Sequence, residues 1–203
     1  MMRVAVLASG SGSNFGALAS ALQQPGSAAQ LVHLVCNVPG AKVLERAAAA
    51  GVPATVVDHR SFSSREAFDA RVAEVVRQTG ADLVCLAGYL RLVTPAFLRA
   101  FPGRVINLHP ALLPSFPGLH AVRQALDAGV RITGVTVHFV DEGTDTGPVI
   151  AQAAVPVLPD DDEASLGARV HAQEHLLYPR VVDAIARGSV QLHGRRVTLK
   201  EWI

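Results

Sequence analysis

The stretch R-V-I-N-L-H-P-A-L-L-P-S-F, Arg104 to Phe116, contains a short apolar strand that ends in polar side chains. Pro110 cannot donate a hydrogen bond to a neighbouring strand, so the strand is predicted to end at His109. Alternate residues of a strand share a face, which places Asn107 and His109 together. In a parallel sheet this carboxyl end is where ligands of open α/β folds bind. A purely structural pair that ties down the proline-rich loop is the alternative.

Strands and helices alternate along most of the chain. We expect strands at residues 3–8, 30–36, 54–57, 83–86 and 105–109, and helices at 15–22, 41–50, 63–79, 94–100 and 121–128. Residues 132–140 and 148–155 are expected to pair antiparallel. A helix over 160–187, broken or bent near Pro179, and a hairpin within 191–202 would follow. The pattern predicts an α/β fold: a Rossmann-like, mostly parallel sheet flanked by helices, with an antiparallel C-terminal extension.

The composition favours a single globular domain. The chain has 203 residues, half of them apolar, and a formal net charge of +1, so no polybasic surface for nucleic acid is evident. Cys36 and Cys85 each end an apolar run, which indicates buried, reduced thiols without metal-ligand spacing. No apolar run approaches the roughly 18 residues of a membrane span. We expect a soluble, cytoplasmic protein that binds neither nucleic acid nor membrane.

The glycine-rich sequence Gly10–Asn14 lies between the first expected strand and the first expected helix. Small residues there let backbone N–H groups and the helix N-terminus approach an anion such as phosphate. A dinucleotide site would have glycine at position 15 and an acidic residue ending the second strand, where Phe15, Cys36 and Asn37 stand. No Gly-Lys-Ser/Thr follows, which disfavours a nucleoside-triphosphate loop. We expect a small phosphate site; a capped glycine turn is the alternative.

Two further loops carry candidate residues. Asp145 lies in D-E-G-T-D-T-G-P, between Gly143 and Gly147. If this turn folds back to the end of the 105–109 strand, the Asp145 carboxylate could orient His109 and favour its protonated form; ordinary turn chemistry is the alternative. The sequence Gly88–Val93 could offer backbone groups and apolar walls to a flat ligand, or could simply pack.

Together these motifs resemble the phosphoribosylglycinamide formyltransferases, a family of folate-dependent enzymes of purine synthesis, over essentially the whole chain. The likeness rests on S-G-S-G-S-N, L-A-G-Y-L-R-L, N-L-H-P-A-L-L-P-S-F-P-G-L-H, T-V-H-F-V-D-E-G-T-D-T-G-P-V-I and R-V-H-A-Q-E-H, in this order. The resemblance implies the formyltransferase fold in a single domain, 1–203. Residues 1–100 would form the half that binds the ribonucleotide phosphate, and 101–203 the catalytic and folate-binding half.

The resemblance also implies roles for particular residues. The catalytic set would be Asn107, His109 and Asp145. The ribonucleotide would contact residues from both halves of the chain: Gly12, Ser13, Asn14 and Glu174. The folate would be bound by backbone and side chains of a larger set, in which Arg65 matches a basic residue near the folate's glutamate tail: Arg65, Leu90, Arg91, Leu92, Val93, Asn107, Asp141 and Asp145. No metal is implied.

Four positions, in three motifs, depart from the family pattern. Ala111 stands where serine is common, Tyr89-Leu90 replaces a more usual Phe-Met, and His171 replaces a more usual glutamine. None of these changes removes a predicted catalytic group, but the last two affect the predicted pockets. The sequence also leaves open whether His138 contacts the site or only packs.

The implied reaction suits the predicted residues. The amine of phosphoribosylglycinamide would attack the formyl carbon of 10-formyltetrahydrofolate, and Asn107 with protonated His109 would donate to the oxyanion that develops. Asp145 would keep His109 charged and help to move the amine proton to the leaving nitrogen. The expected partners are these two small molecules, without a metal, in a monomer or homodimer.

Three rival functions are weighed against this one. A formyltetrahydrofolate deformylase would use the same three groups with water as acceptor, but its family carries an N-terminal regulatory domain for which Met1 to Ala8 leaves no room. A methionyl-tRNA formyltransferase would need a C-terminal nucleic-acid-binding extension beyond Ile203. A non-catalytic nucleotide-sensing module would use Gly10–Asn14 alone and bind a ribonucleotide without turnover.

Overall fold

The protein is described by a computed structural model, and the structure is described for residues 1–200. The chain divides into two compact units, Met1–Ile106 (unit 1) and the part that begins at Asn107 (unit 2). The boundary lies inside strand β5 (Val105–His109), rather than after residue 100. The assignment of all 203 residues to one formyltransferase domain stays a prediction.

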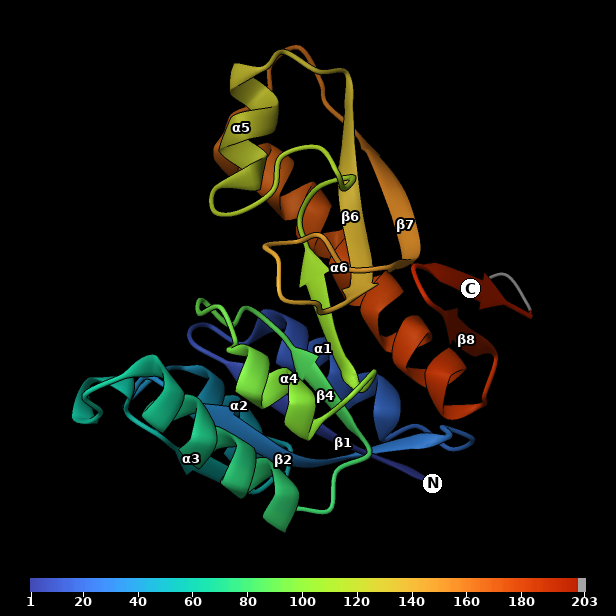
Figure 1. Ribbon diagram of the computed structural model, residues 1–203. Coiled ribbons are helices and arrows are strands. Elements are labelled where there is room, and N and C mark those ends of the chain that lie inside the picture. Colours follow the sequence, from blue (N-terminus) through green and yellow to red (C-terminus); the bar gives the residue numbers. More distant parts are fainter. Residues whose placement is uncertain (201–203) are drawn as a thin grey trace. The chain divides into compact units, whose positions relative to one another are not determined.

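The main sheet is mostly parallel and has the order β3-β2-β1-β4-β5-β6-β7 (Figure 1). Its other strands are β1 (Met2–Ala8), β2 (Ala29–Cys36), β3 (Ala54–Val56), β4 (Leu83–Leu86), β6 (Ile132–Phe139) and β7 (Val149–Pro156). In unit 1, β1 pairs in parallel with β2 and with β4, so that Val6 lies between Leu34 and Cys85. In unit 2, β6 and β7 are antiparallel, with Thr136 opposite Gln152. The predicted fold class is confirmed.

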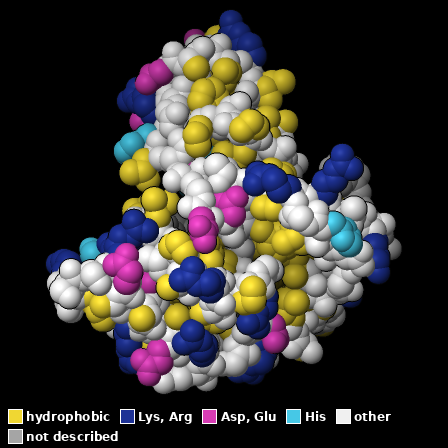
Figure 2. All heavy atoms as spheres, in the orientation of Figure 1, with side chains coloured by type: hydrophobic (Ala, Val, Ile, Leu, Met, Phe, Trp, Pro, Cys, Tyr) yellow, Lys and Arg dark blue, Asp and Glu magenta, His cyan; other side chains and the backbone are white. Residues whose placement is uncertain are grey.

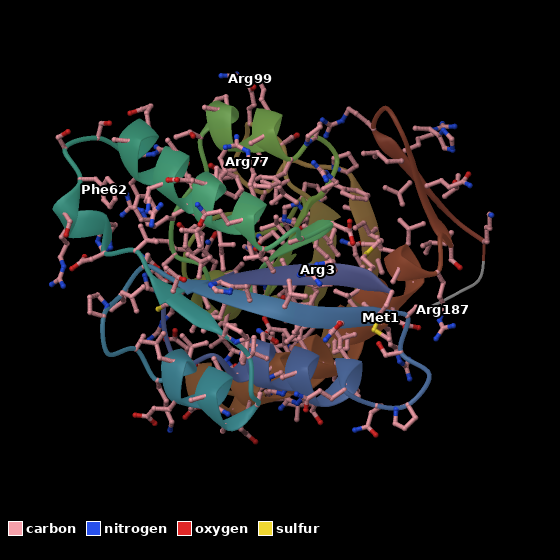
Figure 3. The ribbon with its side chains drawn as sticks, turned by 90° about the horizontal axis from the view of Figure 1, so that it is seen from below. Met1, Arg3, Phe62, Arg77, Arg99 and Arg187 are labelled. Carbon is pink, nitrogen blue, oxygen red and sulfur yellow. The ribbon has the colours of Figure 1, made fainter. Side chains whose placement is uncertain are left out.

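In unit 1 helices cover both faces of the sheet. Helices α1 (Ser13–Leu22) and α2 (Val43–Ala49) lie on one face, and α3 (Arg65–Gln78) and α4 (Pro95–Ala100) lie on the other (Figure 3). Strand β1 is therefore apolar and buried from Val4 to Ala8. A short 3-10 helix, His59–Ser61, was not expected from the sequence.

The start of α3 differs from the sequence pattern by two residues. The pattern placed the helix from residue 63, but Ser64 is extended and its hydroxyl accepts the Ala67 N–H, so the helix begins at Arg65.

Unit 2 contains helices α5 (Ala121–Asp127) and α6 (Glu163–Ala186) and a hairpin of β8 (Val190–His193) and β9 (Arg196–Leu199). Helix α6 packs on β6 and β7. Of the predicted break or bend near Pro179, the break is wrong, because α6 is continuous through it. The proline lacks one helical N–H, but Tyr178, Val181 and Val182 beside it are fully buried and hold the helix in place. The predicted hairpin is confirmed as far as Leu199; positions 201–203 lie outside the described residues.

The surface agrees with the near-neutral composition. On the face drawn in Figure 2, Lys and Arg side chains are scattered among acidic and apolar ones and do not gather into one patch. Within residues 1–200, no helix combines the length and the apolar character that a bilayer span requires.

Candidate active site

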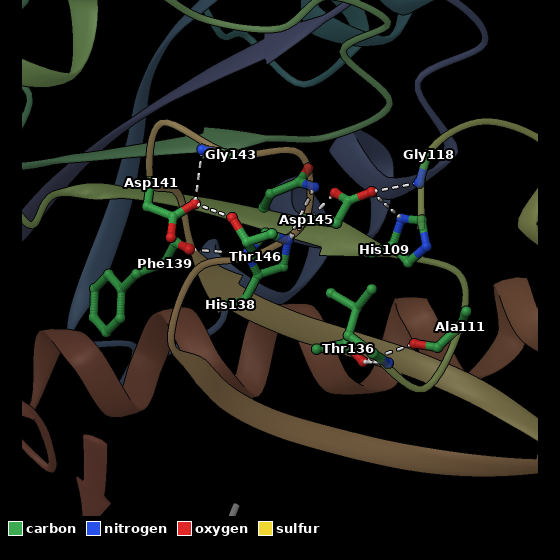
Figure 4. Close-up of polar contacts among 12 residues, drawn as sticks. His109, Ala111, Gly118, Thr136, His138, Phe139, Asp141, Gly143, Asp145 and Thr146 are labelled. Atoms are coloured by element: carbon green, nitrogen blue, oxygen red, sulfur yellow. Dashed lines mark hydrogen bonds and ion pairs between the residues drawn. The ribbon is translucent and has the colours of Figure 1, made fainter. Parts of the chain in front are cut away.

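His109, the last residue of β5, is the centre of a buried polar cluster in unit 2 (Figure 4). Its side chain is only 4% exposed, and its two ring nitrogens face two different oxygens. Nε2 lies 2.7 Å from the carbonyl oxygen of Phe116, and Nδ1 lies 3.3 Å from Oδ2 of Asp145. Because a carbonyl can only accept a hydrogen bond, Nε2 carries a proton. The carboxylate also only accepts, so a proton on Nδ1 makes that contact attractive.

Asp145 reaches His109 from the turn between β6 and β7, so the turn folds back to the end of β5. Its backbone is in the left-handed region, with φ +54°, and its side chain is 12% exposed. The Gly118 N–H donates to Oδ2 at 2.8 Å, and Oδ1 lies 3.7 Å from His138 Nε2. Burial would raise the pKa of this carboxyl, but the contacts with His138, the Gly118 amide and the positive charge of His109 together lower it.

His138, on β6, contacts the site rather than merely packing. Its Nδ1 donates to the Phe139 carbonyl at 2.8 Å. Asn107 Nδ2 lies 3.3 Å from that nitrogen. Nε2 of His138 therefore faces both the Asn107 amide and the Asp145 carboxylate, and links Asn107 to the rest of the cluster.

The turn 141–147 is held mainly by its own residues. Asp141 Oδ1 accepts from the Gly143 N–H at 3.1 Å and from the Thr146 hydroxyl at 2.6 Å. Gly147 approaches the backbone so closely that a Cβ there would lie 1.7 Å from the Phe139 carbonyl oxygen. Arg195, from the β8–β9 hairpin, donates to the Thr146 carbonyl at 2.7 Å. These contacts determine where the turn presents Asp145.

The proline-rich loop 110–117 is tied to β6 and β7. The Thr136 hydroxyl donates to the Ala111 carbonyl at 2.7 Å and accepts from the Leu113 N–H at 3.1 Å. Gln152 Nε2 donates to the Leu113 carbonyl at 2.9 Å. The first half of this loop is thus anchored, while Phe116, with φ +56°, aims its carbonyl at His109.

In unit 1, the predicted phosphate loop leads into the N-terminus of α1. Gly12 is the N-cap with φ +72°, and a Cβ on it would lie 2.5 Å from Val43 Cγ2. Ser13 and Asn14 form the first turn of the helix, where N–H groups lack intrahelical partners. Arg46 Nε donates to the Ser11 carbonyl at 2.8 Å and braces the loop. A helix N-terminus with this geometry suits a small anion.

Unit 1 also contains the predicted folate segment after β4. Leu90 and Leu92 are 70% and 57% exposed, and the guanidinium carbon of Arg91 lies 4.9 Å from the Phe68 ring centroid. Arg65 donates to the Leu92 carbonyl at 3.2 Å. The four predicted residues Leu90 to Val93 and Arg65 therefore belong to one local structure.

Glu174 lies on α6 in unit 2 and is buried. Its Oε2 accepts from Nδ1 of His171 at 2.7 Å, and this hydrogen bond raises the pKa of His171. The departure at position 171 thus places an imidazole directly against the carboxylate that the resemblance assigned to the ribose.

Two groups of predicted residues come together, each inside one unit. Unit 2 joins Asn107, His109 and Asp145, with Asp141 on the same turn, and unit 1 joins Arg65 to the segment after β4. Sequence reasoning missed the contacts of Phe116, Gly118, Thr136 and Arg195. Phe116 and Gly118 act through backbone atoms that every residue type carries, so no residue pattern could have identified them. Within residues 1–200 no group of three or more His, Cys, Asp or Glu side chains is arranged to hold a metal ion.

Comparison with known proteins identifies the class. Residues 2–182 match the family model described as formyl transferase. The protein therefore belongs to the formyl transferase family, and the predicted enzyme class is confirmed.

Individual relatives extend this likeness. Phosphoribosylglycinamide formyltransferase of Bacillus subtilis is 44% identical over 182 residues, which cover 90% of this chain and 93% of that protein. The crystal structure of glycinamide ribonucleotide transformylase 1 from Symbiobacterium toebii has a TM-score of 0.96, with 47% identity over 98% of this chain and 94% of that one. The resemblance seen in the sequence motifs is confirmed.

A longer protein is also similar. The trifunctional purine biosynthetic protein adenosine-3 of Drosophila melanogaster is 49% identical over 189 residues, which cover 92% of this chain. The chain spans only 14% of the length of that relative.

Proposed function

We propose that the protein transfers the formyl group of 10-formyltetrahydrofolate to the amine of 5'-phosphoribosylglycinamide, in purine biosynthesis. Family membership and the likeness to proteins named for this activity support the proposal. The observation that carries it is the pairing of buried His109 with two acceptors, the Phe116 carbonyl and the Asp145 carboxylate. That pairing favours an imidazolium, the charged donor that an oxyanion requires.

The reaction forms one C–N bond and breaks another. The neutral amine attacks the formyl carbon, the carbonyl electrons move to oxygen, and a tetrahedral oxyanion results. Asn107, through its amide N–H, and His109, through Nδ1–H, donate to this oxygen. Nε2 of His109 lies 2.7 Å from the Phe116 carbonyl, whereas Nδ1 faces Asp145 at the longer distance of 3.3 Å, so Nδ1 is the nitrogen that can turn its proton to the substrate. Loss of one such donor costs about 2.7 to 4 kcal/mol in comparable sites.

Collapse of the intermediate releases the folate nitrogen, which must gain the proton that the attacking amine loses. Asp145 is suited to this transfer, directly or through water, because its lowered pKa keeps it ionised. The same carboxylate lies 3.3 Å from Nδ1 of His109 and orients that ring. One carboxylate thus orients the oxyanion donor and accepts the proton.

The other predicted residues bind the two substrates in this proposal. The N-terminus of α1, with Gly12, Ser13 and Asn14, binds the phosphate of the ribonucleotide, and Glu174 binds its ribose. The residues proposed for the folate are Arg65, beside its glutamate tail, and Leu90 to Val93 in unit 1, and Asn107, Asp141 and Asp145 in unit 2. The proposed partners are these two small molecules, and the prediction of a monomer or homodimer stays open to measurement.

One assay tests the proposal. 10-formyltetrahydrofolate is supplied with and without phosphoribosylglycinamide, and loss of the formyl group is followed together with formation of the formylated amine. We expect formyl loss to require the amine and to match product one to one. Formyl loss with water alone would indicate a deformylase instead, and tight binding of the ribonucleotide without turnover would indicate a nucleotide-binding module.

A further inference from the structure

Segment 88–94, which follows β4 in unit 1, combines exposed apolar side chains with a backbone that is tied down at both ends. Leu90 and Leu92 are the exposed side chains in its middle. Exposed leucines on a flexible loop would be unremarkable in a protein surface. Here the backbone that carries them is hydrogen-bonded to buried side chains from elsewhere in unit 1.

Ser9, the residue after β1, holds the first end. Its backbone N–H donates to the Gly88 carbonyl at 3.0 Å, and its Oγ accepts from the Leu90 N–H at 2.9 Å. The same hydroxyl donates to Oδ1 of Asn37 at 2.6 Å. Both Ser9 and Asn37 are buried, so this is a fixed hydrogen-bonded connection between the ends of β1, β2 and β4.

Asp69, on α3, holds the second end. Its carboxylate is buried, with the residue only 2% exposed, and Oδ2 accepts from the Thr94 N–H at 2.5 Å. Arg65, one turn earlier on the same face of α3, donates to the Leu92 carbonyl. Phe68, between them, lies under the Arg91 guanidinium. One face of α3 therefore supports the whole second half of the segment.

We propose that Ser9 and Asp69 are positioning residues for the formyl-donor site, which fix segment 88–94 in the shape that receives the flat ring of the donor before it binds. Neither side chain is needed to touch the ligand. A surface that is already ordered loses little conformational entropy when a ligand binds, so rigid anchors improve affinity without adding contacts. The inference rests on the proposed function, because it takes the segment to be the surface for the folate ring.

Kinetic constants test the positioning role. We expect Ser9→Ala and Asp69→Ala each to raise the KM for 10-formyltetrahydrofolate about tenfold, the loss expected for one hydrogen bond that ordered a binding surface. The kcat and the KM for phosphoribosylglycinamide should change less than about threefold. Asp69→Asn keeps an oxygen that can accept the Thr94 N–H, so it should restore most of the affinity.

Two control variants match these changes without touching the segment. Glu74→Gln removes an exposed acid from α3, and Ser20→Ala removes an exposed hydroxyl from α1. Both should leave all kinetic constants unchanged. If Asp69→Ala does not fold, Ser9→Ala and Asp69→Asn still test the proposal.

Hydrogen–deuterium exchange of the Leu90 and Thr94 amides, measured without ligand, provides a readout independent of activity. We expect exchange at Leu90 to quicken about tenfold in Ser9→Ala, and at Thr94 in Asp69→Ala. Faster exchange with an unchanged KM for 10-formyltetrahydrofolate, or unchanged exchange in both variants, would overturn the proposal.

If the wild-type protein transfers no formyl group, the affinity for 10-formyltetrahydrofolate is measured by calorimetry in place of its KM. Failure of the proposed function is thereby distinguished from failure of this inference.

Discussion

The turn 141–147 and segment 88–94 are both loops with predicted site residues, but they are held in opposite ways. The turn is stabilised largely from within, by the Asp141 carboxylate and by the close approach of Gly147 to Phe139. Segment 88–94 is stabilised from outside, by Ser9 and the α3 side chains. The turn presents one nearly buried carboxylate, whereas the segment presents exposed leucines.

The two loops therefore suit two different roles in the site. A carboxylate that must stay ionised while buried needs several donors around it, and Asp145 meets them outside the turn, in the Gly118 N–H and the His109 ring. An apolar surface for a ring needs a rigid backbone and no polar partners of its own. We therefore expect changes in the turn to alter kcat, and changes around the segment to alter the KM for the formyl donor.

The largest effect is expected from removal of the charge in the turn. Asp145→Asn should lower kcat at least about 100-fold, because His109 loses the carboxylate that favours its protonated form and the leaving nitrogen loses its proton carrier. Steady-state kinetics measure the loss of turnover, and a thermal unfolding curve shows whether the variant is still folded. Asp127→Asn, which changes an exposed acid on α5, should have no effect. Near-normal turnover of Asp145→Asn would remove this residue from the mechanism.

A backbone change tests how the turn is held. Gly147→Ala should lower the free energy of unfolding by about 2 kcal/mol or more, because the new Cβ would collide with the Phe139 carbonyl. Gly167→Ala, at an open position on α6, should instead raise it by about 0.5 to 1 kcal/mol through helix propensity. Urea unfolding of both variants measures this contrast, and equal stability would show that the turn adapts freely.

The free energy of unfolding at acidic pH tests the charge of Asp145. The folded pKa of Asp145 is lowered below its ordinary value of 3.8, so its ionised form stabilises the fold at pH values above 3.8. That contribution is lost as pH falls through the folded pKa. The difference in unfolding free energy between wild type and Asp145→Asn should therefore shrink from pH 6 toward pH 3. A difference that grows on acidification would contradict this sign.

The smallest effect is expected in segment 88–94. The Tyr89 hydroxyl is buried and has no hydrogen-bond partner among residues 1–200; burial, followed by the charge of Asp69, raises the pKa of its phenol. Tyr89→Phe should raise the free energy of unfolding by about 1 kcal/mol, because an unpaired buried hydroxyl is removed. Thr133→Val, at another buried hydroxyl without a partner in the described chain, should act in the same direction. Loss of stability in Tyr89→Phe would mean that the Tyr89 hydroxyl makes a hydrogen bond in the folded protein.

Much of the fold was predictable from local patterns. The alternation of apolar strands with helices, the end of β5 at Pro110 and the pairing of β6 with β7 all follow from period, proline and glycine signals that act over a few residues. The errors have two different causes. Tertiary packing beside Pro179 outweighed one missing helical hydrogen bond, and Ser64 rather than its neighbour had the extended backbone that caps α3.

The candidate site was likewise predictable only in part from the sequence. Residue types and order identified Asn107, His109 and Asp145, because amides, imidazoles and carboxylates are recognisable in the chain itself. The contacts that define their states were not recognisable: the Phe116 carbonyl on His109 and the Gly118 N–H on Asp145 come from backbone groups that all residues share.

The sequence by itself determined which side chains are available and that a strand presents two of them at its end, because those properties depend on residue type and on neighbours close in the chain. The tertiary structure alone decided that the turn 141–147 returns to His109 and that His138 orients Asn107. Such pairings join residues about 30 positions apart, and their geometry depends on how whole strands pack rather than on any local preference.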